Sequence, residues 1–219
     1  MRRLLAFARK QPVQRLPLDL HAVLRALQAM LQPRADAKGL HLIFEVAPDL
    51  PRYVLGDGGK LRQVLLNLLG NALKFTAAGS VTLRAGYGAD ERAVFCVEDT
   101  GPGIAADEIP FLFDEFSQTE AGRHTPQGTG LGLPISYKFV QLMGGSLDVS
   151  SQWQGGSTFC ARLPLPPAAD QANEAAPTVA GLAADSPGAR ILIVDDDAAN
   201  RQVLEQILRP LALDISSVD

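Results

Sequence analysis

The sequence predicts a two-layer α/β sandwich, in which a mixed, mostly antiparallel sheet is covered by helices on one face. First, apolar residues recur at helical spacing in three stretches, around residues 19–33, 59–75 and 133–143. Second, strand-like runs lie next to one another along the chain, so neighbouring runs can pair antiparallel. Third, 219 residues with 47% hydrophobic residues suffice for one well-buried domain and a smaller piece.

The chain is expected to begin in the middle of a helical element. Residues 3–10 can close a helix whose earlier turns are not present, and prolines then mark an extended connector up to residue 17. Asp19 is expected to cap the next helix, because its carboxylate can accept a hydrogen bond from a free backbone N–H. The apolar positions of that helix stop near Pro33, and residues 40–46 follow as a strand.

The helix expected over residues 59–75 carries a polar stripe formed by Gln63, Asn67, Asn71 and Lys74. Asparagine costs roughly half a kcal/mol against alanine inside a helix, so two of them one turn apart need a reason. Amide oxygens at this spacing can bind a magnesium ion and contact phosphate oxygens. The alternative is a solvated polar face near a helix end.

A hairpin is expected from residues 81–87 and 92–98, and its second strand runs into Asp99-Thr-Gly-Pro-Gly. Glycine and proline supply the dihedral angles that turns need, so this run could simply end the strand. It could also form part of a purine site. A carboxylate fixed at a strand end can accept a hydrogen bond from the exocyclic amine of adenine, and glycines let the backbone approach the base.

A glycine-rich segment, residues 128–132, leads into the helix expected over 133–143. Free backbone amides and the positive end of the helix dipole could hold phosphates there, although a flexible loop explains the same composition. Two more strands are expected, at residues 146–150 and 157–163.

Net charge and cysteine content exclude several kinds of protein. The net charge is −4 and the basic residues are scattered, so the basic stripe of a nucleic-acid binder is missing. Cys96 and Cys160 lie in apolar, strand-like surroundings without a C-x-x-C pair, and we expect buried free thiols in a reducing cytosol. No stretch is long and apolar enough to be expected to span a bilayer.

Residues 166–188 are rich in Ala, Pro, Asp, Glu and Gly, which predicts a flexible linker. A β-branched strand over residues 190–194 follows it, ends in Asp195-Asp196-Asp197, and precedes a helix over about residues 200–208. The acidic run could be a helix cap, or it could bind magnesium.

The order and spacing of these motifs resemble those of a known family. The asparagine helix, the Asp-Thr-Gly-x-Gly turn, the Phe113-x-x-Phe116 pair and the glycine-rich loop are similar to the N, G1, F and G2 boxes of the histidine-kinase ATP-binding domain. This domain has the Bergerat-type fold of gyrase, heat-shock chaperones and mismatch-repair ATPases. The resemblance covers about residues 18–165, and residues 67–76 are its most specific stretch.

The resemblance implies a role for each matching residue. Asn71 would bind Mg²⁺, Asn67 and Lys74 would contact the ATP phosphates as the catalytic residues, and Asp99 would recognise adenine. Thr158 would support Asp99 through water, and residues 118–127 would form a mobile lid. The other ATP-binding residues implied are Gly101, Gly103, Ile104, Phe113, Gly128, Thr129, Gly130, Leu131 and Gly132.

The resemblance also favours one reaction over another. The hydrolytic branches of the wider family place a water-activating glutamate one helical turn before the magnesium asparagine, where this chain has Asn67. Because an amide cannot act as a general base, phosphoryl transfer to a protein side chain is favoured over ATP hydrolysis. A nucleotide-binding module without catalysis is the other alternative.

The same resemblance predicts the partners. Residues 4–10 are similar to the end of the dimerisation and phosphoacceptor hairpin, whose acceptor histidine is absent, and His21, His41 and His124 lack its sequence context. Residues 189–219 resemble the start of a receiver domain, in which Asp195 and Asp196 would form an incomplete Mg²⁺ site. We therefore expect a fragment of a hybrid histidine kinase. It would be cytoplasmic, or part of a membrane-anchored sensor, and would work with its hairpin and a receiver domain or response regulator, without nucleic-acid or membrane contact.

Overall fold

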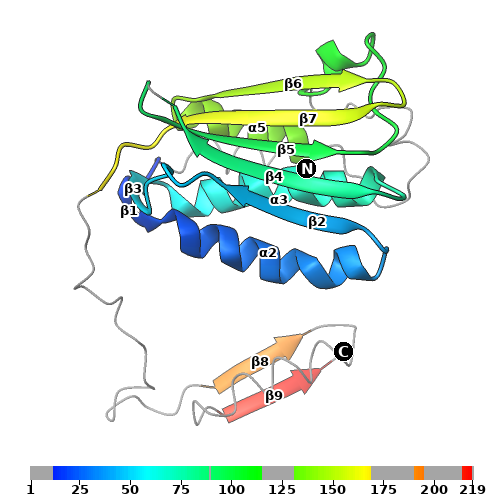
Figure 1. Cartoon of the computed structure of the whole chain (residues 1–219). Coiled ribbons are helices and arrows are strands. Elements are labelled where there is room, and N and C mark those ends of the chain that lie inside the picture. Colours follow the sequence, from blue (N-terminus) through cyan, green and yellow to red (C-terminus); the bar gives the residue numbers. More distant parts are fainter. Residues whose placement is uncertain (1–11, 89, 115–130, 169–189, 195–213, 219) are drawn as a thin grey trace. The chain divides into compact units, whose positions relative to one another are not determined.

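The computed structural model describes residues 12–88, 90–114, 131–168, 190–194 and 214–218. The chain divides into two compact units, Met1–Gln171 and Ala172–Asp219, which are considered separately (Figure 1). The expected helix tail at residues 3–10 and the expected lid at residues 118–127 lie outside the described residues.

The larger unit is built on a five-stranded sheet with the order β2-β4-β5-β7-β6. Its strands are β2 (His41–Val46), β4 (Ser80–Tyr87), β5 (Arg92–Asp99), β6 (Ser146–Gln152) and β7 (Gly156–Pro164). β2 pairs parallel with β4, whereas the three other pairings are antiparallel. The sheet is therefore mixed and mostly antiparallel, as predicted.

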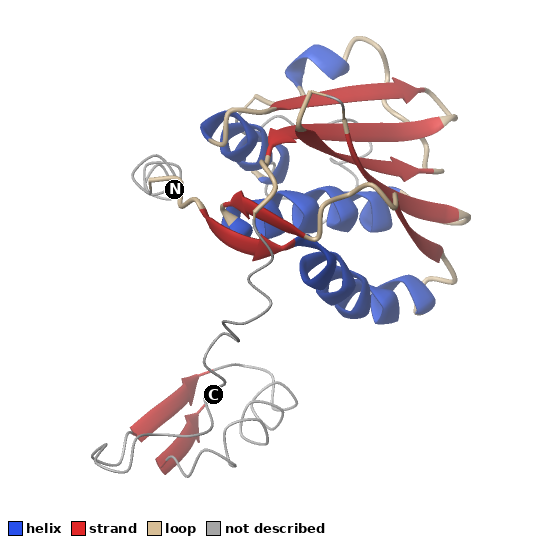
Figure 2. Ribbon diagram, turned by 60° about the vertical axis from the view of Figure 1, so that its left-hand side comes forward, coloured by secondary structure: helices blue, strands red, loops and turns tan. Residues whose placement is uncertain are grey.

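The helices of the described part cover one face of this sheet, as Figure 2 shows: α2 (Leu20–Asp36), α3 (Gly58–Phe75) and α5 (Gly132–Leu142). Among the described residues, one 3₁₀ turn, η1 (Ile109–Phe111), precedes α5 in the chain. The core lies between the two layers, where large side chains such as Phe95, Leu65 and Leu83 are almost fully buried. The predicted two-layer sandwich is confirmed.

Local sequence signals explain where the helices begin. Asp19 accepts a hydrogen bond from Ala22 N at 2.8 Å, and Asp57 accepts one from Lys60 N at 3.0 Å, so each carboxylate caps its helix. α2 continues past Pro33 to Asp36, three residues further than expected. A proline near a helix end removes one hydrogen bond, and the burial of Ala35 holds the last turn against the core.

A two-stranded sheet, which the sequence did not predict, lies beside the main one. β1 (Leu16–Asp19) pairs antiparallel with β3 (Tyr53–Gly56), where a connector was expected. Residues 166–168 follow β3 on its other side, since Leu55 N donates to Pro166 O and Ala168 N donates to Tyr53 O. The first residues of the expected linker are therefore hydrogen-bonded to the larger unit.

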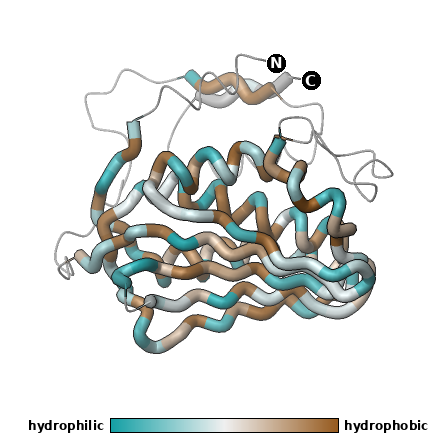
Figure 3. Tube along the Cα trace, turned by 90° about the horizontal axis from the view of Figure 1, so that it is seen from above, coloured by the Kyte–Doolittle hydropathy of each residue, from teal (hydrophilic) through white to brown (hydrophobic). Residues whose placement is uncertain are grey.

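Hydrophobic and hydrophilic residues alternate along the strands of the main sheet (Figure 3). The side chains that face the helices are buried, among them Val81, Leu83 and Phe95. The other face is polar and solvent-exposed, and on it Arg84 forms ion pairs with Glu45 and Glu98. The period of two that separates these faces is the ordinary geometry of a strand.

The two cysteines correct a prediction. Cys96 and Cys160 form a disulfide, whereas buried free thiols were expected. They occupy directly opposed positions on β5 and β7, on the polar face of the sheet, and both are partly exposed. This pairing depends on the register between two strands that are far apart in the sequence, so the residues around each cysteine do not reveal it.

In the smaller unit, β8 (Arg190–Val194) forms as predicted and pairs parallel with β9 (Asp214–Val218), which was not predicted. Asp195, Asp196 and the helix expected over residues 200–208 lie outside the described residues. Among the described helices, none is both long and apolar enough to cross a membrane.

Candidate functional site

A small cavity of about 70 Å³ opens between α3, the ends of β5 and β7, and the segment that follows β5. Its lining is mostly apolar and includes one carboxylate, that of Asp99. The lining residues are Asn71, Ala72, Phe75, Asp99, Pro102, Gly103, Ile104, Leu112, Leu133, Ser157 and Phe159. A concave, mostly apolar cavity with a few convergent polar groups is typical of a small-molecule site.

Asp99 is the polar centre of the cavity. Its Oδ1 accepts a hydrogen bond from Gly101 N at 2.9 Å, and the backbone N–H of Ser157 also donates to the carboxylate. Burial raises the pKa of Asp99 above its ordinary value of 3.8, and the negative charge of Glu98 adds to this, although the two backbone N–H groups oppose it. A partly desolvated acceptor held in one place is suited to recognising an amino group.

The register of β5 and β7 corrects the role expected for Thr158. Asp99 lies opposite Ser157, whereas Thr158 lies opposite Glu98. Because side chains alternate along a strand, Ser157 faces the helices and lines the cavity, while Thr158 belongs to the polar face of the sheet. Ser157, and not Thr158, is therefore the hydroxyl placed beside Asp99.

The glycines of the turn after β5 have separate roles. Gly103 has φ +69°, and a Cβ there would overlap the carbonyl oxygen of Gln152, the last residue of β6. This position therefore requires glycine, and Gly103 lines the cavity as predicted. Gly101 does not line it. Its contribution is the N–H that orients Asp99.

The polar stripe of α3 reaches the cavity at Asn71. This residue lies one turn before the C-terminal end of α3. The Asn71 side chain makes no hydrogen bond to another described residue, so its amide oxygen is available to a ligand. Lys74 does not line the cavity, and its Nζ lies 4.9 Å from the ring centroid of Phe75. Within the described residues, no cluster of three or more His, Cys, Asp or Glu could hold a metal ion by itself.

Asn67, one turn earlier, is held by the first two turns of α5. Its Nδ2 donates to Gly132 O at 3.2 Å and to Ser136 Oγ at 3.1 Å. Its Oδ1 accepts from Gln63 Nε2 at 3.1 Å. The side chain that the sequence assigned to phosphate contact thus also joins α3 to α5, a role that sequence reasoning missed.

Other predicted residues are placed as follows. Ile104 lines the cavity, and its N–H donates to Ser151 Oγ. Phe113 stacks on Tyr137 of α5 with ring centroids 4.8 Å apart, so it anchors the segment after η1 and does not enter the cavity. Gly132 begins α5 next to Leu131, whereas Phe116, Gly128, Thr129 and Gly130 lie outside the described residues.

Two histidines, His21 and His41, lie within the described residues. His21 lies in the first turn of α2 with its Nε2 3.3 Å from Leu50 O, and His41 begins β2 with an exposed side chain. Neither is among the residues that line the cavity. His124 is outside the described residues.

Comparison with known proteins identifies the family. Residues 56–167, about half of the chain, match the family described as histidine kinase-, DNA gyrase B- and HSP90-like ATPases. The chain belongs to this ATPase family. The matched residues include α3, Asp99, the whole cavity lining and β7.

Two curated relatives belong to sensory systems. The chain is 35% identical over 230 residues to the sensory/regulatory protein RpfC of Xanthomonas campestris pv. campestris, covering 92% of this chain and 32% of that protein. It is 34% identical over 216 residues to the aerobic respiration control sensor protein ArcB of Escherichia coli, covering 96% of this chain and 27% of that protein. The chain thus spans about a third or less of these relatives.

Two solved structures have a fold similar to that of this chain. Full-length ShkA in complex with AMPPNP superposes with a TM-score of 0.65 at 32% identity, covering 95% of this chain and 41% of that one. The Acinetobacter baumannii histidine kinase AdeS gives a TM-score of 0.60 at 23% identity, covering 74% of this chain and 73% of that one. This second likeness bears on the fold alone.

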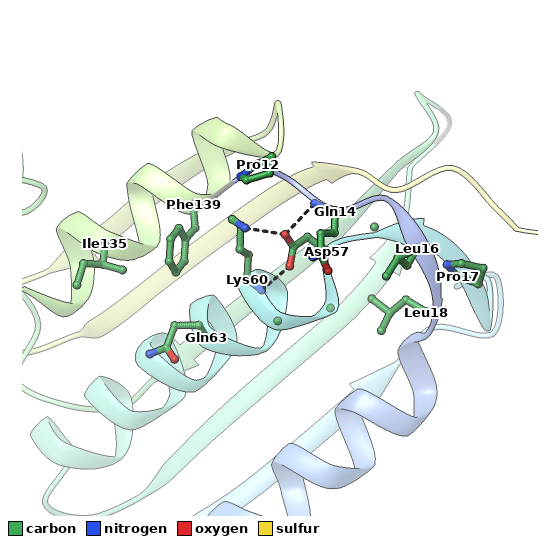
Figure 4. A pocket seen from close by; sticks show the side chains of 13 residues that line it. Pro12, Gln14, Leu16, Pro17, Leu18, Asp57, Lys60, Gln63, Ile135 and Phe139 are labelled. Carbon is green, nitrogen blue, oxygen red and sulfur yellow. Dashed lines mark hydrogen bonds and ion pairs between the residues drawn. The ribbon is translucent and has the colours of Figure 1, made fainter. Parts of the chain in front are cut away.

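A second, larger cavity of about 830 Å³ lies away from Asp99, between the connector, the start of α3 and one face of α5 (Figure 4). At its centre Asp57 pairs with Lys60 at 2.7 Å, and both side chains are buried. Asp57 also accepts a hydrogen bond from Gln14 N at 3.1 Å. This carboxylate therefore caps α3 and fastens the connector to it.

The stability supplied by Asp57 should depend on pH. Burial by itself raises the pKa of Asp57, but hydrogen bonds from Lys60 and Gln14 and the charge of Lys60 outweigh it, so the net pKa lies below 3.8. A carboxyl with a lower pKa in the folded state contributes stability above its unfolded value, and this is lost as the pH falls through the folded value. Asp57→Asn should therefore lower the free energy of unfolding by about 2 kcal/mol at neutral pH, and by progressively less as the pH falls below about 4.

Urea unfolding of both proteins between pH 3 and pH 7, roughly the range over which carboxylates titrate, checks this prediction. Asp148→Asn is the control, because Asp148 forms an exposed ion pair with Arg162 and should matter little at any pH. A stability difference for Asp57→Asn that stays constant down to the lowest pH would contradict the prediction.

Proposed function

We propose that this chain binds Mg-ATP and transfers the γ-phosphoryl group to a histidine on a dimerisation hairpin that lies outside it. The observation that carries the proposal is the combination of a partly buried Asp99 in a mostly apolar cavity with an amide, Asn67, one turn before Asn71. The first feature suits adenine, and the second leaves the site without the general base that hydrolysis requires. The family and the kinase relatives support the same activity.

In this proposal each residue positions one part of the nucleotide. Asp99 accepts the hydrogen bond of the adenine amino group, while Gly103 and Ile104 contact the base. Asn71 suits Mg²⁺, because its amide oxygen is a hard ligand, lines the cavity and has no described partner. When bound, Mg²⁺ would neutralise charge on the phosphate oxygens. Lys74 and the α5 N-terminus would complete the binding of the phosphates.

Phosphoryl transfer needs little beyond these contacts. The transition state spreads negative charge over the equatorial oxygens, so catalysis consists of positioning and charge stabilisation. An ATPase would need a carboxylate near the attacking water, and Asp99 is the one carboxylate that lines the described cavity. Since Asp99 is committed to Gly101 and to the base, it is unsuited to activating water.

The partners belong to the same proposal. We infer that the residues before the connector continue into the phosphoacceptor hairpin, and that β8 begins a receiver domain whose acidic residues Asp195 and Asp196 bind Mg²⁺. The parallel pairing of β8 with β9 supports this inference, because parallel strands need a crossover between them. The proposed setting is the cytoplasm, where the reducing conditions would keep Cys96 and Cys160 as thiols.

Incubation with γ-labelled ATP tests the function. The chain alone should remain unlabelled, because no described histidine lies at the cavity and transfer requires an acceptor within roughly 3–3.5 Å of the phosphorus. A separately supplied histidine-bearing hairpin should become labelled, and Asn71→Ala should abolish this labelling. Release of labelled phosphate while the hairpin stays unlabelled would favour the ATPase alternative. Label on His124 of the isolated chain would refute the expected lack of self-transfer.

A further inference from the structure

The Asn67 amide uses every hydrogen-bonding group that it presents to α5. Two of its contacts go to the first two turns of that helix, to Gly132 O and Ser136 Oγ, and Gln63 donates to its oxygen from the same face of α3. A backbone carbonyl can only accept, so the contact with Gly132 determines which end of the amide faces α5. Asn67 is therefore held in one orientation.

Ser136 is an unusual residue for its position. It is fully buried in α5, with 0% exposure, although serine is a poor helix former and mostly lies at the surface. No described buried side-chain polar atom lacks a partner, so its hydroxyl is satisfied at this place. Packing alone would be served better by alanine, which suggests that the hydroxyl is present for its contact with Asn67.

This contact lies where α5 meets the proposed phosphate site. Gly132, the first residue of α5, accepts a hydrogen bond from Asn67. The next residue, Leu133, lines the cavity. The free amides at the start of a helix are the groups that would face phosphates. A small rotation of the first turn of α5 would therefore change phosphate contacts while leaving Asp99, on β5, in place.

We propose that Ser136 is a positioning residue for the phosphate end of the nucleotide, acting through Asn67. The hydroxyl holds the Asn67 amide, and the pair fixes the first turn of α5 against α3. This inference rests on the proposed function, since it assigns the phosphates to that end of the cavity. It predicts a selective defect, in which ATP binding weakens and binding of the base alone does not.

The test compares ATP with adenosine on the whole chain by calorimetry. Ser136→Ala should weaken ATP binding about fivefold, which is the effect of one hydrogen bond, and adenosine binding by less than about twofold. In an Asn67→Ala background the same Ser136→Ala substitution should have no further effect on ATP, because the two residues act as one unit.

Two further variants make the result decisive. Val140→Ala shortens another fully buried side chain of α5, so it should lower stability without changing the ratio of ATP to adenosine affinity. Gln63→Met removes the donor to Asn67 Oδ1 at an exposed position, so it should fold normally and shift the ratio in the same direction as Ser136→Ala.

Three results would overturn the inference. One is an equal loss for ATP and adenosine in Ser136→Ala, which would indicate a structural role. The second is an ATP affinity that Ser136→Ala leaves unchanged. The third is a Ser136→Ala effect that keeps its full size in the Asn67→Ala background. Failure of the unmodified chain to bind ATP would instead refute the proposed function, so the two failures are distinguishable.

Discussion

Replacing Asp99 with asparagine should lower the affinity for ATP by about 10- to 100-fold, the range expected for a hydrogen bond to a charged group. The carboxylate is held by Gly101 N and lines the cavity, and an asparagine that keeps this hydrogen bond must do so with its oxygen. It could then turn its amino group toward the amino group of adenine, where two donors repel. Selectivity for ATP over GTP should disappear with the affinity.

The same substitution should not destabilise the nucleotide-free domain. Because the pKa of Asp99 is raised by burial, its ionised form costs the folded state free energy at neutral pH. A raised folded-state pKa gives a stability contribution that is complete below the unfolded value of 3.8 and is lost as the pH rises through the folded value. Asp99→Asn should remove this dependence and leave the neutral-pH stability equal or higher.

Calorimetry with ATP and GTP measures the first effect, and urea unfolding measures the second. Glu98→Gln is the matched control, because it removes the neighbouring carboxylate from the opposite, exposed face of the sheet. ATP affinity should change little in this control. Equal affinities of the wild type for ATP and GTP would argue against the adenine role of Asp99.

Reduction of the Cys96–Cys160 disulfide should lower the free energy of unfolding by about 4 kcal/mol in the chain-entropy estimate. The bond joins residues 64 positions apart, so it restricts a long segment of the unfolded chain. It also links β5 to β7, the two strands that carry Asp99 and Ser157. Reduction should therefore shift the urea midpoint of the whole domain cooperatively.

Urea titrations with and without dithiothreitol test this prediction. The double variant Cys96→Ser/Cys160→Ser should unfold at the same urea concentration in both conditions, near the value of the reduced wild type. Alkylation of the unfolded protein and mass measurement would count free thiols in each sample. Identical midpoints for an oxidised and a fully reduced wild type would contradict the prediction.

Much of the secondary structure was predictable because its signals are local. Asp19 and Asp57 precede apolar residues at helical spacing, and both cap the helices that follow. The β4–β5 hairpin and the β6–β7 pair alternate with a period of two. The parallel β2–β4 pair and the β1–β3 pair bring together residues that are far apart in sequence, so no local pattern predicts them.

The candidate site shows the same division. The order of Asn71, Asp99 and Gly103 along the chain identified the cavity, because each residue type has a chemical reason to be there. Ser157 was missed in favour of Thr158, although counting which strand positions are apolar would have placed it on the buried face. The ATP-binding roles of Gly128, Thr129 and Gly130 stay predictions.

The sequence by itself determined the described helices, most of the described strands and the family, and it supplied the proposal of which residues recognise a nucleotide, because these depend on residue types at short spacing. Only the tertiary structure decided that Ser157 accompanies Asp99, that Cys96 meets Cys160, and that Ser136 holds Asn67. Each of these contacts depends on the register of two elements. A shift of one residue in a strand turns every side chain to the opposite face, and long-range packing alone sets that register.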